Sequence, residues 1–168
     1  MHSDESEMKH AAGFVFYEIE QFRWAMKNIP NEWRCGTSGI LREEDAVVEV
    51  ALLHARALRE FFFRRRTSIS RTSNWWSDVL AEDFFDDPSQ WKIPTMTFLG
   101  DKNNKDRLDR SLSHLTYHRI EYQVKNQKRW DFSAMSQDIE ESYSKFLDLL
   151  PAGRQAWFAD SQFAEWEP

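Results

Sequence analysis

Apolar residues recur at helical spacing in four long stretches of the chain, separated by polar segments. The first stretch predicts a helix over Glu7–Ile29, where a proline follows. The second covers Ile40–Arg66, with acidic residues in its opening turns and arginines at its close, as the helix dipole favours. The third covers about Asp101–Val124. The fourth is expected to start from a cap at Ser133 and to end before Pro151.

The second stretch is apolar on two sides, which predicts a central helix. Between the second and third stretches we expect a short helix over Trp76–Phe85. An irregular segment over Ser89–Gly100 should follow, with Trp91 as a packing anchor. Aromatic residues after Pro151 are expected to dock on the helices. The sequence therefore predicts an all-α fold, a helical bundle of four long helices plus one or two short ones.

Composition supports this fold and narrows the class of protein. The 168 residues suit a single domain over positions 1–168, with about residues 1–6 disordered, and only five Gly and five Pro favour long helices. A single cysteine excludes an internal disulfide. The acidic start and the lack of a long apolar run predict a cytoplasmic chain with no membrane segment. A net charge of −6 argues against chain-wide affinity for nucleic acid, yet allows a local basic patch.

Two polar residues interrupt apolar stripes and are candidate binding residues. His54 lies in the main stripe of the second helix, and Arg119 lies in that of the third. A buried guanidinium needs a partner, and the candidates are Asp78 and Glu82, four residues apart on the predicted short helix. These groups form either a hydrogen-bonded lock between helices or a polar pocket for a ligand.

A second pair of polar residues, His114 and His118, shares one face of the third helix. Together with His54 and nearby acids, such as Glu82, these imidazoles are candidate metal ligands, which gives a third hypothesis, a metal-dependent enzyme. However, the spacing is not that of the HExxH motif, and a complete ligand set is missing. We therefore expect no metal and no cofactor.

One basic concentration stands out in this acidic chain. It is either a strip that contacts phosphate or RNA, or a helix end paired with the acidic run Asp78–Asp87. Its members are Arg56, Arg59, Arg64, Arg65, Arg66 and Arg71.

Three segments carry a resemblance to a group of uncharacterised bacterial helical proteins. The segments begin at Leu53 (LHARAL, with FF following), Asp78 (DVLAEDFF) and Leu112 (LSHLTYHR), and the resemblance covers about Val47–Trp130. It implies no activity and supports only the fold and the compartment.

A looser similarity is to HEPN-type helical bundles, many of which are metal-independent ribonucleases. Their signature is an Arg followed by four to six residues and a His, and here six residues separate Arg107 from His114. The family places a polar residue directly after the Arg, whereas this chain has Leu108. The similarity implies that His114 acts as general acid or base on an RNA 2′-hydroxyl or leaving oxygen, that Arg107 stabilises phosphate charge, and that a homodimer composes the site.

The leading functional hypothesis is therefore an HEPN-like protein that handles RNA or a nucleotide. The alternative is a non-catalytic protein-interaction module, whose Trp- and Phe-rich surface binds a partner helix or protein. Whether the chain is an enzyme stays open.

Overall fold

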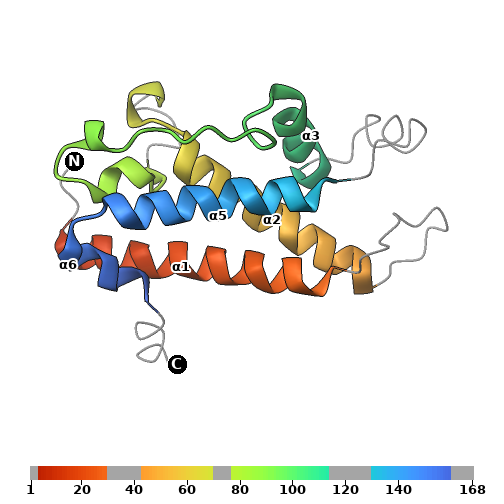
Figure 1. Cartoon of the computed structure of the whole chain (residues 1–168), viewed down its shortest axis with the longest axis horizontal. Helices are drawn as coiled ribbons and strands as arrows, with labels where there is room; N and C mark the ends of the chain where they lie inside the picture. The colour runs from red at the N-terminus through yellow and green to blue at the C-terminus, as the bar shows by residue number, and fades with distance from the viewer. Residues whose placement is uncertain (1–3, 30–42, 70–76, 114–129, 160–168) are drawn as a thin grey trace.

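A computed structural model describes residues 4–29, 43–69, 77–113 and 130–159. These four ranges contain helices and irregular connections and no strand, which confirms the predicted all-α class for this part of the chain. The longer helices are α1 (Glu5–Asn28), α2 (Glu43–Phe63), α3 (Lys102–Ser113) and α5 (Phe132–Leu149) (Figure 1). The short helices are η1 (Arg66–Ser68), η3 (Ala81–Phe84), η4 (Pro88–Gln90), α6 (Ala152–Gln155) and η5 (Ala156–Phe158).

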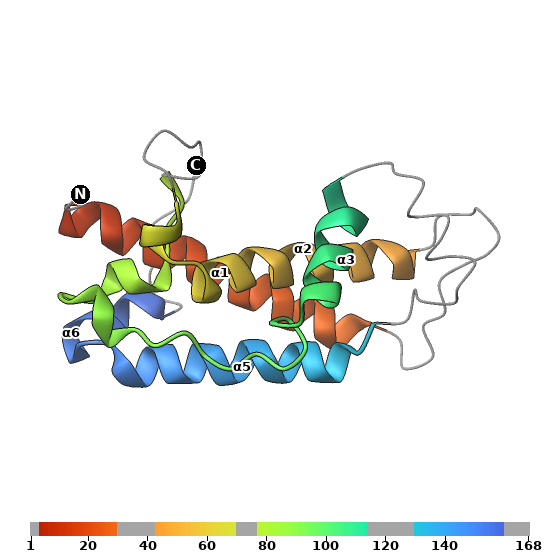
Figure 2. The same ribbon diagram turned by 90° about the horizontal axis from the view of Figure 1, so that it is seen from above.

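Three helices run lengthwise and the fourth crosses their end. α1 and α5 lie alongside each other in opposite directions, and α3 stands across the end of the molecule away from α6 (Figures 1 and 2). α2 packs against α1, α3 and α5, as its two apolar sides predicted. The segment between η4 and α3 runs along α5 (Figure 2).

α1 begins at Glu5, two residues before its predicted start, and ends at Asn28, one residue before its predicted end. The carboxylate of Asp4 accepts a hydrogen bond from the backbone N–H of Ser6 at 3.3 Å, and acidic residues occupy the first turn, where the helix dipole favours them. The helix buries one apolar stripe: Ala12, Val15, Ile19, Phe22 and Ala25.

α5 begins two residues earlier than its predicted cap allows. Asp131, rather than Ser133, caps the helix, because its carboxylate accepts the backbone N–H of Ala134 at 2.9 Å. The prediction of Ser133 as the cap is therefore wrong. The helix ends at Leu149, before Pro151, as predicted.

Phe146 of α5 is the centre of an aromatic core. Its ring is fully buried and lies 5.1–6.0 Å, centroid to centroid, from six other aromatic rings. Those rings belong to Phe61, Phe62, Phe84, Phe85, Trp91 and Phe158. All six contacts are edge-to-face, an arrangement that aromatic quadrupoles favour. Residues from α2, α5, η3 and η5 are thereby joined in one cluster.

The predicted short helix over Trp76–Phe85 is wrong in its described part. The chain is extended before η3, with Leu80 at φ −121° and ψ 152°, and only Ala81–Phe84 forms a 3-10 helix. The segment after it is irregular, as predicted. Trp91 is its anchor, since the buried indole N–H donates to the carbonyl oxygen of Phe62 at 3.0 Å.

α3 begins where Asp101 accepts the backbone N–H groups of Asn103 and Asn104. The residue before this cap is a glycine, Gly100, and a side chain would not fit there, because a Cβ would lie 2.2 Å from the carbonyl oxygen of Met96. The helix is described to Ser113, so its predicted continuation to Val124 lies outside the described residues.

One aromatic residue after Pro151 confirms the predicted docking. Phe158 is buried against the aromatic core. The more distal Phe163 and Trp166 lie outside the described residues.

Candidate functional site

His54 lies in the apolar interface between α1 and α2, as its position in the stripe predicted. The residue is 8% exposed, and its Nδ1 lies 2.7 Å from Oε2 of Glu18 on α1. The ring of Tyr17 approaches the imidazole edge-on at 6.1 Å. The imidazole N–H therefore donates to a carboxylate that is itself about one-third exposed. Glu18 is a partner that the sequence did not suggest, because the predicted partners lay on the short acidic segment.

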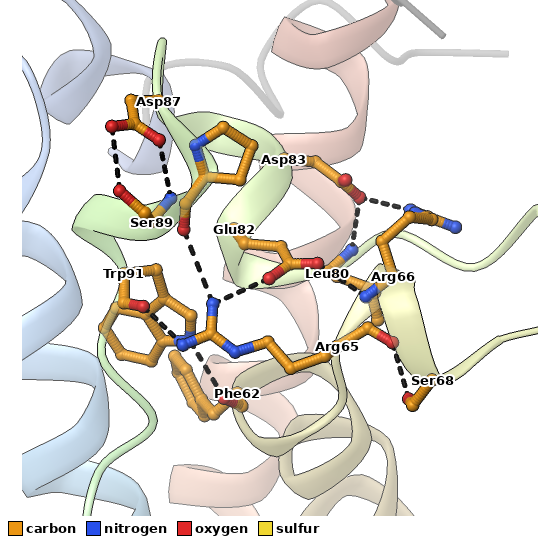
Figure 3. Close-up of polar contacts among 11 residues, drawn as sticks. Phe62, Arg65, Arg66, Ser68, Leu80, Glu82, Asp83, Asp87, Ser89 and Trp91 are labelled. Carbon is orange, nitrogen blue, oxygen red and sulfur yellow. Dashed lines mark hydrogen bonds and ion pairs between the residues drawn. The ribbon is translucent and has the colours of Figure 1, made fainter.

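Three consecutive arginines that follow α2 bind the acidic segment around η3. Figure 3 shows the contacts of two of them, Arg65 and Arg66. Arg64 pairs with Asp78 at 2.9 Å, and Arg65 pairs with Glu82 at 2.7 Å. Arg66 pairs with Asp83, whose carboxylate also accepts the backbone N–H of Leu80 at 2.8 Å. We call these six side chains the arginine lock. It confirms the predicted pairing with the acidic run for Arg64, Arg65 and Arg66. The predicted helix end is wrong, because α2 ends at Phe63 and the arginines follow it instead of closing its last turn.

The carboxylate of Glu82 is the buried part of the arginine lock. The residue is 5% exposed and accepts from Nη1 of Arg65 and, at 2.5 Å, from the backbone N–H of Arg66. Arg65 also donates to the carbonyl oxygens of Pro88 and Trp91. Such bonds satisfy both the guanidinium and the buried acid, so the lock holds η3 against α2.

Asp78 and Glu82 do not share a helix face, because Asp78 precedes η3 outside any helix and only Glu82 lies in η3. Each pairs with an arginine of the same lock, through the contacts given above. They are thus brought close to α2 but are bonded to Arg64 and Arg65, not to His54. A ligand-binding role for either acid stays a prediction.

The other described arginines of the basic run also lie against internal acceptors. Arg56 bonds to Asp109 of α3 at 2.9 Å, and the buried Arg59 donates to the carbonyl oxygen of Leu99 at 2.7 Å. Burial raises the pKa of Asp109, but hydrogen bonds and charge from Lys105 and Arg56 outweigh this effect, so the pKa lies below its usual value. Of the predicted basic set, only Arg71 lies outside the described residues.

Arg107 lies on α3 with its guanidinium stacked over the indole of Trp130, 3.8 Å from the ring centroid. The neighbouring Leu108 is 1% exposed and belongs to the core, which accounts for an apolar residue at that position. The stack gives Arg107 a packing role, as a cation–π pair between α3 and the start of α5.

The remaining predicted site residues, His114, His118 and Arg119, lie outside the described residues. The pairing of Arg107 with His114 and the binding roles of His118 and Arg119 therefore stay predictions. Within the four described ranges, no three His, Cys, Asp or Glu side chains gather as a group that could hold a metal ion.

A buried aspartate on α5 is a polar site that sequence reasoning missed. Asp138 is 4% exposed, and its carboxylate accepts the backbone N–H groups of Thr97, Phe98 and Leu99 at 2.7–2.9 Å. These bonds fasten the irregular segment before α3 to α5. The sequence feature that could have indicated it is a charged residue at position 138, directly beside Ile139 of the apolar stripe of α5.

Exposed aromatic side chains on α1 are the second feature that sequence reasoning missed. Phe14, Tyr17 and Trp24 are 57%, 44% and 51% exposed and lie beside the buried stripe of the helix, with the ring of Tyr17 next to His54 of α2. The exposed His10 precedes Tyr17 by seven residues. At 100° per residue these four side chains fall within an arc of about 80°. We call them the α1 stripe. The signal was their helical spacing beside the buried positions.

Comparison with known proteins adds no assignment. No protein-family model, no curated protein and no solved structure matches the chain. The bacterial resemblance and the HEPN similarity thus stay interpretations of the sequence. Among the helices of the described residues, none is long and apolar enough to cross a membrane.

Proposed function

We propose that this chain is a non-catalytic protein-interaction module and that the α1 stripe is its binding face. The observation that carries the proposal is the alignment of Phe14, Tyr17 and Trp24, each at least 44% exposed, on one face of one helix. Single exposed apolar residues are ordinary on protein surfaces, but aligned large aromatics are typical of binding faces. Tyr and Trp are also the residues that most often supply binding energy in protein interfaces.

The arginine lock supports the same proposal because it weakens the competing RNA-binding hypothesis. An RNA-contacting strip needs arginines that can reach phosphate, and each such contact contributes through released counterions. Arg64, Arg65 and Arg66 are each bonded to a carboxylate of the chain itself. Phosphate would have to displace those carboxylates, so this basic run favours an internal structural role over an RNA-binding one.

The experiment uses the purified chain as immobilised bait against an extract of the cells that produce it. Wild-type bait is compared with Trp24→Asp and with the matched control Leu149→Asp, which places the same charge at a 45% exposed apolar position on α5. We expect at least one protein to bind wild type and control but not the Trp24 variant. Identical sets of bound proteins on all three baits would refute the α1 stripe as the binding face.

A ribonuclease assay distinguishes this proposal from the HEPN-like one. The wild type is incubated with structured and single-stranded RNAs in EDTA, beside Arg107→Ala and His114→Ala. We expect no cleavage that depends on either residue. Cleavage by the wild type that is absent in both folded variants would replace the interaction module with an RNA-cleaving enzyme.

A further inference from the structure

The pair formed by His54 and Glu18 lies at the border between the α1 stripe and α2. Tyr17 belongs to the stripe, and the centroid of its ring lies 6.1 Å from that of the imidazole. Glu18 follows Tyr17 directly and lies one helical turn after Phe14, so its carboxylate borders the stripe. His54 is buried, whereas the side chain of Glu18 is 32% exposed. A protein that covers the stripe would therefore also remove water from this pair.

Within the described residues, the ionisable groups that contact His54 both come from α1. They are the carboxylate of Glu18 and the phenol of Tyr17. α3 meets α2 through a separate ion pair, that of Arg56 with Asp109. η3 meets α2 through the arginine lock, and α5 meets it through aromatic rings. The charge at the border of the stripe thus depends on His54 and Glu18 themselves.

Uptake of a proton by His54 changes the net charge of this pair and keeps its hydrogen bond. Nδ1 carries a hydrogen toward Glu18 in both the neutral and the doubly protonated ring, so the second proton binds at Nε2. The pair then has no net charge, whereas with a neutral imidazole it keeps the negative charge of the carboxylate. Removing water from an uncompensated charge costs more free energy than removing it from a neutralised pair. The stripe is therefore easier to cover when His54 is doubly protonated.

We propose that the His54–Glu18 pair couples binding at the α1 stripe to the uptake of a proton, so that the stripe binds its protein partner more tightly when His54 is doubly protonated. This inference rests on the proposed function and adds a form of regulation to the same face. Imidazole is the side chain that most often provides such a proton switch. The coupling arises from the loss of water at the pair, so it applies to any protein that covers Tyr17.

The first experiment tests the contact between His54 and the stripe, and it needs no partner. The chain is labelled with ring-13C tyrosine, the Tyr17 signal is assigned with Tyr17→Phe, and spectra are recorded across a pH series. The Cε1–H signal of the His54 ring gives the midpoint of its titration in the same samples. The Tyr17 signal should shift with that midpoint, and the shift should be absent in His54→Gln, while the buried Tyr143 stays fixed. A Tyr17 signal that does not follow the titration of His54 would overturn the proposal.

The second experiment measures the binding of the protein that wild-type bait captures, at one pH on each side of the His54 midpoint. The wild type should bind at least about fivefold more tightly on the acidic side, the lower end of the couplings typical of linked sites. His54→Gln should lose this dependence. His10→Gln is the matched control, because it removes the ionisable ring that lies on the stripe itself, and it should keep the dependence. Circular dichroism of each variant verifies that the fold is intact.

Glu18→Gln gives the sharpest test, because it should reverse the sign of the pH dependence. With an amide at position 18, the pair is uncharged when the imidazole is neutral and positive when the ring is doubly protonated. The variant should therefore bind less tightly on the acidic side. A merely structural role of Glu18 would weaken binding equally at both pH values. A Glu18→Gln variant with the pH dependence of the wild type would overturn the coupling.

The outcomes also separate this inference from the proposed function. If the wild-type bait captures no protein through Trp24 at either pH, the proposed function is refuted and the coupling is refuted with it. If a protein binds in a Trp24-dependent manner but with equal affinity on both sides of the His54 midpoint, the interaction module stands and the coupling alone is overturned.

Discussion

Glu82→Ala is the sharpest perturbation of the arginine lock, because it removes the buried carboxylate and leaves its donors in place. The backbone N–H of Arg66 loses an acceptor at 2.5 Å, a loss that costs about 1–3 kcal/mol when the donor is buried. Arg65 keeps its bonds to two backbone carbonyls, and its side chain is 27% exposed. The cost should therefore fall below the roughly 3–5 kcal/mol of a fully buried broken pair. We expect a loss of about 2–3 kcal/mol in the free energy of unfolding.

The assay is urea denaturation at pH 7 followed by far-UV circular dichroism, with the wild type and two further variants measured in parallel. Glu82→Gln keeps one side-chain oxygen acceptor and should lose less than the alanine variant. Glu141→Ala removes an exposed acid of α5 that bonds to Gln137, and it should change stability by less than about 0.5 kcal/mol. A Glu82→Ala midpoint equal to that of the wild type would show that the lock contributes nothing and would refute the reasoning.

Three further predictions concern the core and the other polar contacts. Phe146→Ala should lose about 3–5 kcal/mol in chemical denaturation, since it empties the centre of the aromatic cluster, whereas the exposed Leu149→Ala should be nearly neutral. Asp138→Asn should accelerate hydrogen exchange at the amides of residues 97–99, because one of their two acceptor oxygens is replaced by a donor. The lowered pKa of Asp109 means that its ion pairs stabilise the fold at neutral pH and that this contribution is lost as pH falls through the folded-state pKa. Asp109→Asn should therefore be less stable than the wild type at pH 7, by a few tenths of a kcal/mol, and equally stable once the pH is below that value.

The predictable part of the fold was the part determined by local periodicity. The buried stripes of α1 and α5 and the central place of α2 follow from apolar spacing in the sequence. The segment around η3 was mispredicted because its conformation depends on tertiary ion pairs. Asp78 and Glu82 were predicted to lie on one helix, but Asp78 lies outside any helix and Glu82 lies in η3, and each pairs with an arginine that follows α2.

Features of the candidate site were predictable only where they depend on the residue pattern of a single helix. The burial of His54 follows from its position in an apolar stripe, but its partner Glu18 lies 36 residues away on another helix. No local pattern specifies such a pairing. Asp138 was missed for the same reason. Its carboxylate oxygens accept hydrogen bonds from backbone N–H groups of residues 97–99, a segment with no periodic pattern.

The environment of Trp24 tests the α1 stripe most directly. The chain is labelled with 5-fluorotryptophan, the Trp24 resonance is assigned with Trp24→Phe, and fluorine NMR spectra are recorded before and after addition of the protein that wild-type bait captures from the extract. If the α1 stripe binds that protein, the Trp24 resonance should shift, while that of the fully buried Trp91 stays fixed. A Trp24 resonance that does not move while sedimentation shows the complex would contradict the assignment of the α1 stripe as the binding face.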